Sequence, residues 1–261
     1  MREAIPLFQV DAFTDEPFAG NPAAVCLNEV WLPDELMQRI AAENNLSETA
    51  FLVPLGEDWQ LRWFTPTTEV DLCGHATLAS AFVLYDQLQP EAEDIRFHTK
   101  SGVLEVRRPG EDIVLDFPSL PPEACSPLPA LAEALEAEPR ELLRVKHWYV
   151  AVFEREADVA ALAPSMPGLL GLGKSVIATA PGDNVDFVSR CFCPAVGVPE
   201  DPVTGSAHCT LTPYWSKRLG KKRLQARQIS ARGGSLRCED HGERVAIAGR
   251  AVLVLRGELF V

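Results

Sequence analysis

Two short segments of the chain combine acidic, imidazole, thiol and hydroxyl side chains, which are groups that can transfer protons. These side chains are Asp71, Cys73 and His75 in the first segment, and Glu200, Asp201, Thr204, Ser206 and His208 in the second. Two acid/base groups on opposite sides of one carbon atom can remove a proton from one face and return one to another position or face. Burial would raise the pKa of a carboxyl group toward the working pH and favour this role. The residue types therefore indicate acid–base chemistry.

Each of these segments also contains a glycine and leads into an expected helix. Gly74 and Gly205 remove the side chain where the backbone must approach something closely. The free N–H groups and the positive dipole end of the first helical turn suit a carboxylate or an enolate-like oxygen. Two such helix ends facing one another would hold an anionic substrate from both sides. The alternative is that the glycines only permit tight turns from strand to helix, and the sequence leaves both interpretations open.

The two segments belong to an internal duplication. Residues 62–66 (RWFTP) recur as residues 190–194 (RCFCP), at an offset of 128. The sequence CGHA at 73–76 aligns with TGSA at 204–207, at an offset of 131. Two further matches follow in the same order, at 99–106 with 230–238 and at 110–111 with 242–243. Offsets close to half the chain length indicate a duplicated domain, because solenoid repeats have periods of about 20–50 residues.

The elements that must position these segments can be predicted from the pattern of apolar residues. In the first half, β-branched and aromatic residues bounded by Gly, Pro, Asn and Asp predict strands. The predicted strands are residues 5–13, 24–27, 49–53 and 61–65. Helical spacing predicts helices over 33–43 and 74–88, and the second helix is so apolar that strands should surround it on most sides.

A proline-rich stretch marks the expected boundary between two lobes. Residues 118–129 contain five prolines and cannot form a central strand. The sequence therefore predicts an N-terminal lobe over residues 1–118 and a C-terminal lobe over residues 119–261. The last strand of the chain is able to cross over to the N-terminal lobe.

Composition excludes several classes of partner and cofactor. The formal charge of −13 over 261 residues argues against nucleic acid as a partner, because such binding needs a basic face. Residues 1–10 do not have the pattern of a signal peptide, and no stretch of about 18 apolar residues predicts a membrane span. The seven cysteines include no CxxC, and Cys191 and Cys193 lack a second ligand pair for zinc. We expect a cytoplasmic protein with reduced thiols and no membrane contact.

Five segments carry a resemblance to a known family. They read FQVDAF (8–13), FAGNP (18–22), LSETAF (46–51), CGHAT (73–77) and EDPVTGSA (200–207). In these segments the chain resembles the PhzF-like (phenazine biosynthesis isomerase-like) family, which shares the diaminopimelate epimerase fold. The resemblance implies an α+β fold of two pseudo-symmetric lobes, each a mixed β-sheet or barrel wrapped around a central helix. It also implies an active site in the cleft between the lobes.

The resemblance further implies a role for each site residue. Glu48 would be the main proton-transferring carboxylate, and His75, Asp201 and Ser206 would line the same pocket and assist proton movement. The residues implied to contact the substrate are Asn21, Cys73, Gly74, Thr204 and Gly205. The implied enzyme takes a small anionic substrate, uses neither metal nor organic cofactor, and forms a homodimer.

Cys73 keeps a second chemistry open. The resemblance implies a small apolar residue at this place in the phenazine enzyme, whereas epimerases of the same fold have one thiol here and a second in the other half. Asp201 takes the second place in this chain, so a two-thiol racemase is incomplete. Cys73 is either a catalytic thiol or a small buried residue.

Three functions are consistent with these residues and with the resemblance. The first is a cofactor-independent isomerase that moves a proton on a small carboxylate-bearing substrate with Glu48. The second is an amino-acid racemase or epimerase that uses Cys73 with an opposing carboxylate. The third is a non-catalytic protein that binds a small molecule.

Overall fold

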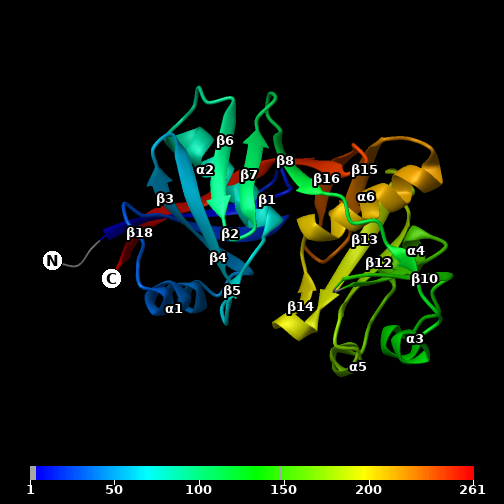
Figure 1. Cartoon of the computed structure of the whole chain (residues 1–261). Helices are drawn as coiled ribbons and strands as arrows, with labels where there is room; N and C mark the ends of the chain where they lie inside the picture. The colour runs from blue at the N-terminus through cyan, green and yellow to red at the C-terminus, as the bar shows by residue number, and fades with distance from the viewer. Residues whose placement is uncertain (1–3, 147) are drawn as a thin grey trace. The chain divides into compact units, whose positions relative to one another are not determined.

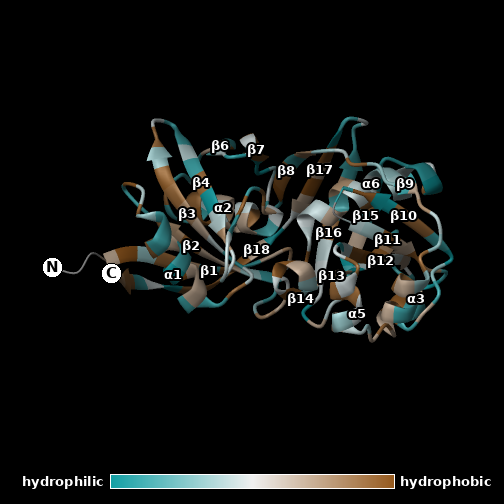
Figure 2. Ribbon diagram, turned by 60° about the horizontal axis from the view of Figure 1, so that its bottom comes forward, coloured by the Kyte–Doolittle hydropathy of each residue, from teal (hydrophilic) through white to brown (hydrophobic). Residues whose placement is uncertain are grey.

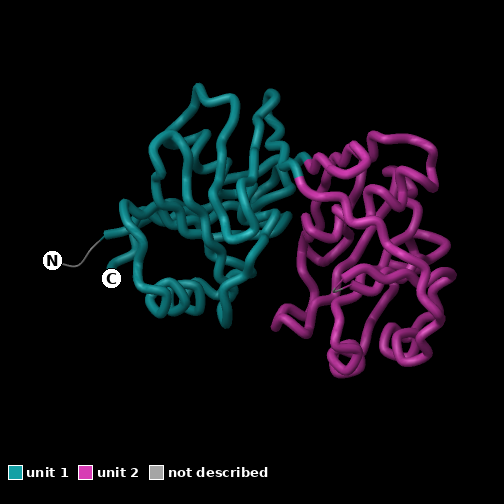
Figure 3. The backbone as a smooth tube through the Cα atoms, in the orientation of Figure 1, with its two compact units in different colours: residues 1–116, 248–261 teal, residues 117–247 magenta. Residues whose placement is uncertain are grey.

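The computed structural model of the chain describes residues 4–146 and 148–261, which form two compact units (Figures 1 and 3). Unit 1 combines the chain up to residue 116 with residues 248–261, and unit 2 contains residues 117–247. The predicted lobes were 1–118 and 119–261, and the last strand lies in unit 1. Residues 1–3, which belong to the segment without a signal-peptide pattern, lie outside the described residues.

Unit 1 is a mixed sheet with two helices. Its strands are β1 (Ala4–Ala12), β2 (Asn21–Leu27), β3 (Glu48–Leu55), β4 (Asp58–Phe64), β5 (Glu69–Val70), β6 (Asp94–Thr99), β7 (Gly102–Arg107), β8 (Ile113–Pro118, which ends in unit 2) and β18 (Ala251–Phe260). β1 lies between β18 and β2, and β2 runs parallel to β3. β3 and β4 are antiparallel, β4 and β6 are parallel, and β6 and β7 are antiparallel. Figure 1 shows the first and last strands of the chain, β1 and β18, side by side.

The helix that the sequence predicted at 74–88 is the centre of unit 1. Helix α2 (Gly74–Gln87) contacts β1, β2, β3 and β18, and eleven of its fourteen residues are buried. The buried hydroxyl groups of Thr77 and Ser80 find acceptors within the first turns. Thr77 donates to the carbonyl of Cys73, and Ser80 donates to that of Ala76. The predicted burial of this helix among strands is confirmed. The other helix of unit 1, α1 (Asp34–Asn44), matches the helix predicted over 33–43.

Unit 2 repeats this order of pairings. Its elements are β9 (Glu123–Ala124), α3 (Pro129–Leu135), β10 (Glu141–Val145), β11 (Trp148–Val152), α4 (Glu156–Ala160), α5 (Met166–Gly171), β12 (Ser175–Pro181), β13 (Phe187–Cys193), η1 (Pro194–Val196), β14 (Val198–Asp201), α6 (Gly205–Leu219), β15 (Arg223–Gln228), β16 (Gly234–Asp240) and β17 (Arg244–Gly249, which ends in unit 1). β10 and β11 are antiparallel, β11 and β12 parallel, β12 and β13 antiparallel, β13 and β15 parallel, and β15 and β16 antiparallel. The same series runs from β1 to β7, so the structure has the duplication predicted from the sequence.

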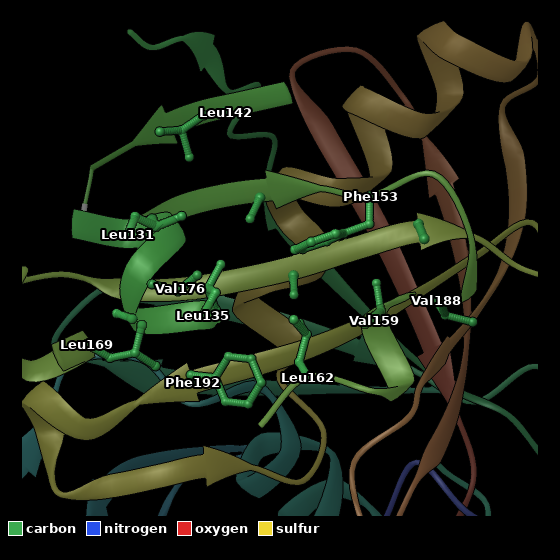
Figure 4. Close-up of a cluster of buried hydrophobic side chains, with 14 residues drawn as sticks. Leu131, Leu135, Leu142, Phe153, Val159, Leu162, Leu169, Val176, Val188 and Phe192 are labelled. Carbon is green, nitrogen blue, oxygen red and sulfur yellow. The ribbon is translucent and has the colours of Figure 1, made fainter. Parts of the chain in front are cut away.

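The core of unit 2 outside α6 lies between short helices and the sheet. Leu131 and Leu135 of α3 and Leu169 of α5 pack in one cluster with Val176 of β12 and Phe192 of β13 (Figure 4). The sequence pattern predicted no elements between residues 120 and 180. Each of these helices has seven residues or fewer, which is too short to show a helical period.

The strands of both units carry hydrophobic and hydrophilic residues along their length (Figure 2). In β4, Trp59, Leu61 and Trp63 are buried and alternate with the less buried Gln60 and Arg62. This alternation is typical of a strand with one face in the core. Among the described residues, no helix is long and apolar enough to cross a membrane.

A strained loop connects β1 to β2. Phe18 has a positive φ of 68°, and its N–H donates to the Asp11 carboxylate at 2.7 Å. Gly20 has a φ of +63°, and a Cβ at this position would lie 2.2 Å from the carbonyl oxygen of Ala12. Glycine is therefore required at this position both for its φ and for its small size.

Replacing Gly20 should cost more stability than replacing a glycine of equal φ in open space. Gly56 has a φ of +62°, and a Cβ added there would meet nothing within 4 Å, so Gly56→Ala should cost about 1–2 kcal/mol. Gly20→Ala adds a steric clash with backbone and should lower the free energy of unfolding clearly further. Urea denaturation of both variants measures the difference, and equal losses would contradict the close approach to Ala12.

Candidate active site

Three elements of unit 1 bring Asn21, Glu48 and His75 together. Asn21 is the first residue of β2, and Glu48 is the first residue of β3, which pairs with β2 in parallel. Parallel neighbours begin at the same edge of a sheet, so both side chains lie at one end of the strands. His75 is in the first turn of α2, whose helix packs on β2 and β3. Residues 54 positions apart thus become neighbours.

The His75 ring lies between an amide, a thiol and a carboxylate. Its Nδ1 is 3.1 Å from Asn21 Nδ2 and 3.5 Å from Cys73 Sγ. On the other side, its Nε2 is 3.1 Å from Glu48 Oε2. Neither Nε2 nor Oε2 makes a hydrogen bond of regular angle within the described part of the chain, although both atoms are buried. Two buried polar atoms are therefore close to one another and lack the full set of hydrogen bonds they can make.

Asn21 decides which nitrogen of neutral His75 carries the proton. In the observed orientation the amide nitrogen faces Nδ1, so Asn21 donates and Nδ1 accepts. The ring proton then lies on Nε2 and faces Glu48. When the ring becomes an imidazolium, Nδ1 also needs an acceptor, which the amide oxygen would supply if the side chain turned over. The Asn21 amide is thus coupled to the charge of the ring.

The local charges favour the imidazolium form. Burial by itself lowers the pKa of His75, but the charge of Glu48 beside Nε2 acts in the opposite direction and raises that pKa above the usual 6.5. The side chain of His75 is 4% exposed and that of Glu48 is 15% exposed, so solvent screens this interaction poorly. The Glu48 carboxylate therefore favours the imidazolium form of His75.

Cys73 is held as a thiol. It is the residue before α2, and burial, followed by the charge of Glu48, raises its pKa to about 11. His75 and the N–H of Ala76 in the first helical turn act in the opposite direction and do not prevail. At pH 7 only about one in ten thousand of these side chains would be a thiolate. Cys73 is therefore a poor base in the resting site.

Glu48, Cys73 and His75 also have the donor types of a metal site. One ligand atom from each lies within 4.8 Å of the others. Three protein ligands of these types occur in catalytic zinc sites. However, the thiol lies beside Nδ1 and the carboxylate beside Nε2, and the Asn21 amide already lies 3.1 Å from Nδ1. A metal at Nδ1 would have to displace that amide, so the arrangement suits proton exchange better than ligation.

An arginine clamp supports the loop before each central helix. Arg62 forms two hydrogen bonds with the Glu69 carboxylate, at 2.7 and 2.9 Å, and lies over the Phe64 ring. This contact holds the pKa of Glu69 below its usual value. Glu69 is in β5, between β4 and the Cys73–His75 segment, so the clamp fixes the chain that leads to the site.

Unit 2 has the same clamp. Arg190 binds Glu200 at 2.8 and 2.9 Å and lies over the Phe192 ring. The repeated R-x-F-x-P sequence is therefore a repeated structural device. In each unit its arginine and aromatic ring fix the hairpin that precedes the central helix.

The predicted residues of unit 2 form their own polar cluster. The Thr204 hydroxyl donates to the Asp201 carboxylate at 2.5 Å, and Gly205 and Ser206 open helix α6. Gln228 is fully buried and supports this loop, because it accepts from the Thr204 N–H at 2.9 Å and donates to the Asp201 carbonyl at 2.6 Å. That Asp201 and Ser206 meet Glu48 and His75 around one substrate stays a prediction.

Asp71 and His208 belong to the two sequence segments with acid–base side chains, but their surroundings differ from those of the residues above. Asp71 is exposed, and His208 is buried in α6, where burial lowers its pKa to about 4 and its Nδ1 donates to the Thr204 carbonyl. The neutral ring of His208 packs near Phe187, as a core histidine does.

Sequence reasoning missed two residues that position the site. Asp11 is 1% exposed and anchors the loop that ends at Asn21. Its signal was present, since it lies inside the FQVDAF segment. Gln228 had no such signal, because it ends an ordinary strand 24 residues after the loop that it supports.

Comparison with known proteins gives consistent matches over the whole chain. The sequence model of the family described as phenazine biosynthesis-like protein matches residues 10–257. A protein of Pseudomonas aeruginosa named an uncharacterized isomerase is 54% identical over 256 residues, which cover 98% of both chains. A solved PhzF family structure from Enterococcus faecalis matches with a TM-score of 0.96 and 48% identity, and covers 99% of this chain and 100% of that one.

A more distant structure shares the fold alone. A hydroxyproline epimerase from Agrobacterium vitis matches with a TM-score of 0.66 at 12% identity, over 100% of this chain and 94% of that one. The predicted fold class, α+β with two related lobes of mixed sheet around a central helix, is confirmed.

Glu48→Gln should lower the pKa of His75, because the variant removes the charge that favours the imidazolium. A group whose folded-state pKa is raised contributes stability that is complete below the unfolded value, about 6.5, and is lost as the pH rises through the folded value. The wild-type free energy of unfolding should therefore fall more steeply over this window than that of the variant. NMR titration of the His75 ring measures the pKa, with Glu43→Gln in α1 as an exposed control. An unchanged pKa in Glu48→Gln would refute the coupling.

Proposed function

The chain belongs to the phenazine biosynthesis-like (PhzF) family, and on that premise we propose that it moves a proton on a small carboxylate-bearing substrate with Glu48 as the acid–base group. The names of its relatives support an isomerase-like enzyme. The observation that carries the finer proposal is the buried contact of 3.1 Å between Glu48 Oε2 and His75 Nε2. A carboxylate and an imidazole at this distance can share and exchange a proton.

In unit 1 the proposed reaction uses Glu48 and His75. The Glu48 carboxylate takes a proton from a substrate carbon, and the electron pair of the broken C–H bond is delocalised into the neighbouring unsaturated system. Glu48, now a carboxylic acid, returns the proton to a different carbon, so that a double bond shifts. The His75 imidazolium stabilises the carboxylate form of Glu48 before and after this cycle.

Racemisation with Cys73 is the second candidate. The contact that favours it is the 3.5 Å between Cys73 Sγ and His75 Nδ1, which is within reach of a proton transfer. Against it stands the Cys73 pKa of about 11, which makes the thiolate rare at neutral pH. A binding protein without turnover is the third candidate, and the buried Glu48–His75 contact, with its unsatisfied polar atoms, favours catalysis over it.

We also propose that Asp201 and Ser206 assist the proton transfer. The residues proposed to contact the substrate are Asn21, Cys73, Gly74, Thr204 and Gly205. Asp201 already accepts a hydrogen bond from Thr204, so it is oriented by its own unit. The substrate would be a small anion, and the enzyme would act in the cytoplasm.

Deuterium exchange separates the three candidates. The protein is incubated in D₂O with a panel of L-amino acids and small unsaturated carboxylic acids, and deuterium entering each compound is measured by NMR and mass spectrometry. If Glu48 transfers the proton, Glu48→Gln should lower the exchange rate by about 10²–10⁴-fold, and Cys73→Ala should leave it nearly unchanged.

The controls for this experiment come from the same chain. Glu43→Gln makes the same chemical change at an exposed position and should keep the wild-type rate. The reverse result, with Cys73→Ala inactive and Glu48→Gln active, would establish the racemase instead. Binding of a panel compound with no exchange in any variant would establish the binding protein. Asp201→Asn and Ser206→Ala should each slow the exchange if unit 2 takes part.

Removal of metal ions should leave the exchange rate unchanged, because Glu48 and His75 move the proton without a Lewis acid. Dialysis against a strong chelator, with metal analysis of the protein before and after, provides the measurement. A loss of exchange that added zinc restores would overturn the metal-free mechanism and assign Glu48, Cys73 and His75 as ligands.

A further inference from the structure

Cys73, His75 and Glu48 lie in the order of a catalytic triad. Cys73 Sγ is 3.5 Å from His75 Nδ1, and His75 Nε2 is 3.1 Å from Glu48 Oε2, so the ring contacts the thiol through one nitrogen and the carboxylate through the other. In such a series the imidazole takes the proton of a nucleophile, and the carboxylate orients the imidazole and stabilises the imidazolium that forms. The proton shift proposed for Glu48 gives the thiol no role.

The protonation state of the ring suits this series. Neutral His75 carries its proton on Nε2, which faces Glu48, and leaves Nδ1 to accept from Asn21 and from the Cys73 thiol. Because Glu48 favours the imidazolium, it makes the ring a stronger base toward that thiol. The high pKa of the thiol is no obstacle, since a general base removes the proton of a nucleophile as the new bond forms.

The start of α2 offers donors for a developing oxyanion. Cys73 is the residue before the helix, and the N–H groups of Gly74 and His75 occupy helical positions that have no acceptor within the helix. Gly74 has no side chain that would keep an acyl group away from these donors. Backbone N–H groups beside a nucleophile stabilise the negative oxygen of a tetrahedral intermediate. One unit therefore contains a nucleophile, a base, an orienting carboxylate and oxyanion donors.

The contact between His75 and Glu48 is close but not closed by a regular hydrogen bond. Within residues 4–146 and 148–261, His75 Nε2 and Glu48 Oε2 are buried without a hydrogen bond of regular angle, although the His75 side chain is 4% exposed. Catalytic hydrogen bonds are often poorly aligned in the free enzyme and tighten when the substrate binds. Burial also restricts the substrate, because Cys73 is 5% exposed and has room only for a short acyl group.

We propose that Cys73 is a nucleophile that hydrolyses esters or thioesters of short acyl groups, with His75 as its base and Glu48 as the orienting carboxylate. Sγ attacks the carbonyl carbon while the thiol proton moves to Nδ1, and the oxyanion accepts from the N–H groups at the start of α2. The bond to the leaving group then breaks, and the leaving alkoxide or thiolate takes the proton from Nδ1. Water next attacks the acylated thiol and gives a proton to Nδ1, the C–S bond breaks to release the acid, and Sγ regains that proton.

This activity differs from both proton-transfer candidates. Racemisation would use the Cys73 thiolate as a base on a C–H bond, whereas here Sγ forms a bond to an acyl carbon. The hydrolysis does not rest on the proposed proton shift, although both involve His75 and Glu48. The two activities depend differently on the thiol. Cys73→Ala should abolish acyl transfer and leave the deuterium exchange by Glu48 nearly unchanged, so the failure of one proposal is distinguishable from the failure of the other.

The small activated ester p-nitrophenyl acetate tests the proposal on the whole chain. The wild-type protein should release more than one equivalent of p-nitrophenol per chain, and peptide mass spectrometry after an acid quench should find the acetyl group on Cys73. Cys73→Ala should lower the rate of release at least about tenfold. Glu48→Gln should slow the acetylation of Cys73 by at least about 10²-fold, because His75 loses the group that orients it.

Cys125 provides the control thiol. It lies in unit 2 and is more exposed than Cys73, so a reagent that selected thiols by access alone would acetylate Cys125 first. Cys125→Ala should keep the wild-type rate of release, and circular dichroism should show that all three variants are folded. Acetylation of Cys125 before Cys73, equal acetylation of Cys73 in the wild type and in Glu48→Gln, or a release that stops at one equivalent would each overturn the proposal.

Discussion

The burial of one imidazole beside one carboxylate is the constraint on which unit 1 depends. A charged ring in the interior is costly, and His75 is tolerated because Glu48 and Cys73 lie within a few ångströms of its two nitrogens. For these atoms to meet, β2 and β3 must begin at the same edge and α2 must begin above that edge. The apolar character of α2 follows from this, since the helix that carries the ring packs against β1, β2, β3 and β18.

The helices and strands whose residue pattern extends over many positions could be predicted from the sequence. The apolar helix at 74–88 and the duplicated R-x-F-x-P segments led to the two related units, because each marks the same step in the same topology. His75 was identified by its residue type and Glu48 by resemblance, and their contact could not be derived from spacing. It depends on a parallel pairing between strands separated by α1.

Other features of the structure have no recognisable pattern in the sequence. The helices between residues 129 and 171 are too short for a helical period, and they form only because the sheet of unit 2 offers an apolar face to cover. Gln228 looks like any polar residue at the end of a strand, and its role emerges only when the loop at 201–204 folds over it.

The arginine clamps show the opposite case, where a motif was visible in the sequence and its physical role was not. Both halves of the chain share the scaffold, whereas Cys73 and His75 of the first half correspond to Thr204 and Ser206 of the second half.

The pairing of β1 with β18 has a consequence for how the protein is made. β1 leaves the ribosome before unit 2, but β18, one of its two neighbours in the sheet, is synthesised after unit 2, and Ala4 pairs with Phe260. Unit 2 is continuous in the chain and has all of its residues before that strand emerges. At about 5–20 residues per second, β1 waits on the order of ten seconds or more for its partner. The half that begins first must therefore finish last, and nascent chains exposing β1 are the stage at which a chaperone would be needed most.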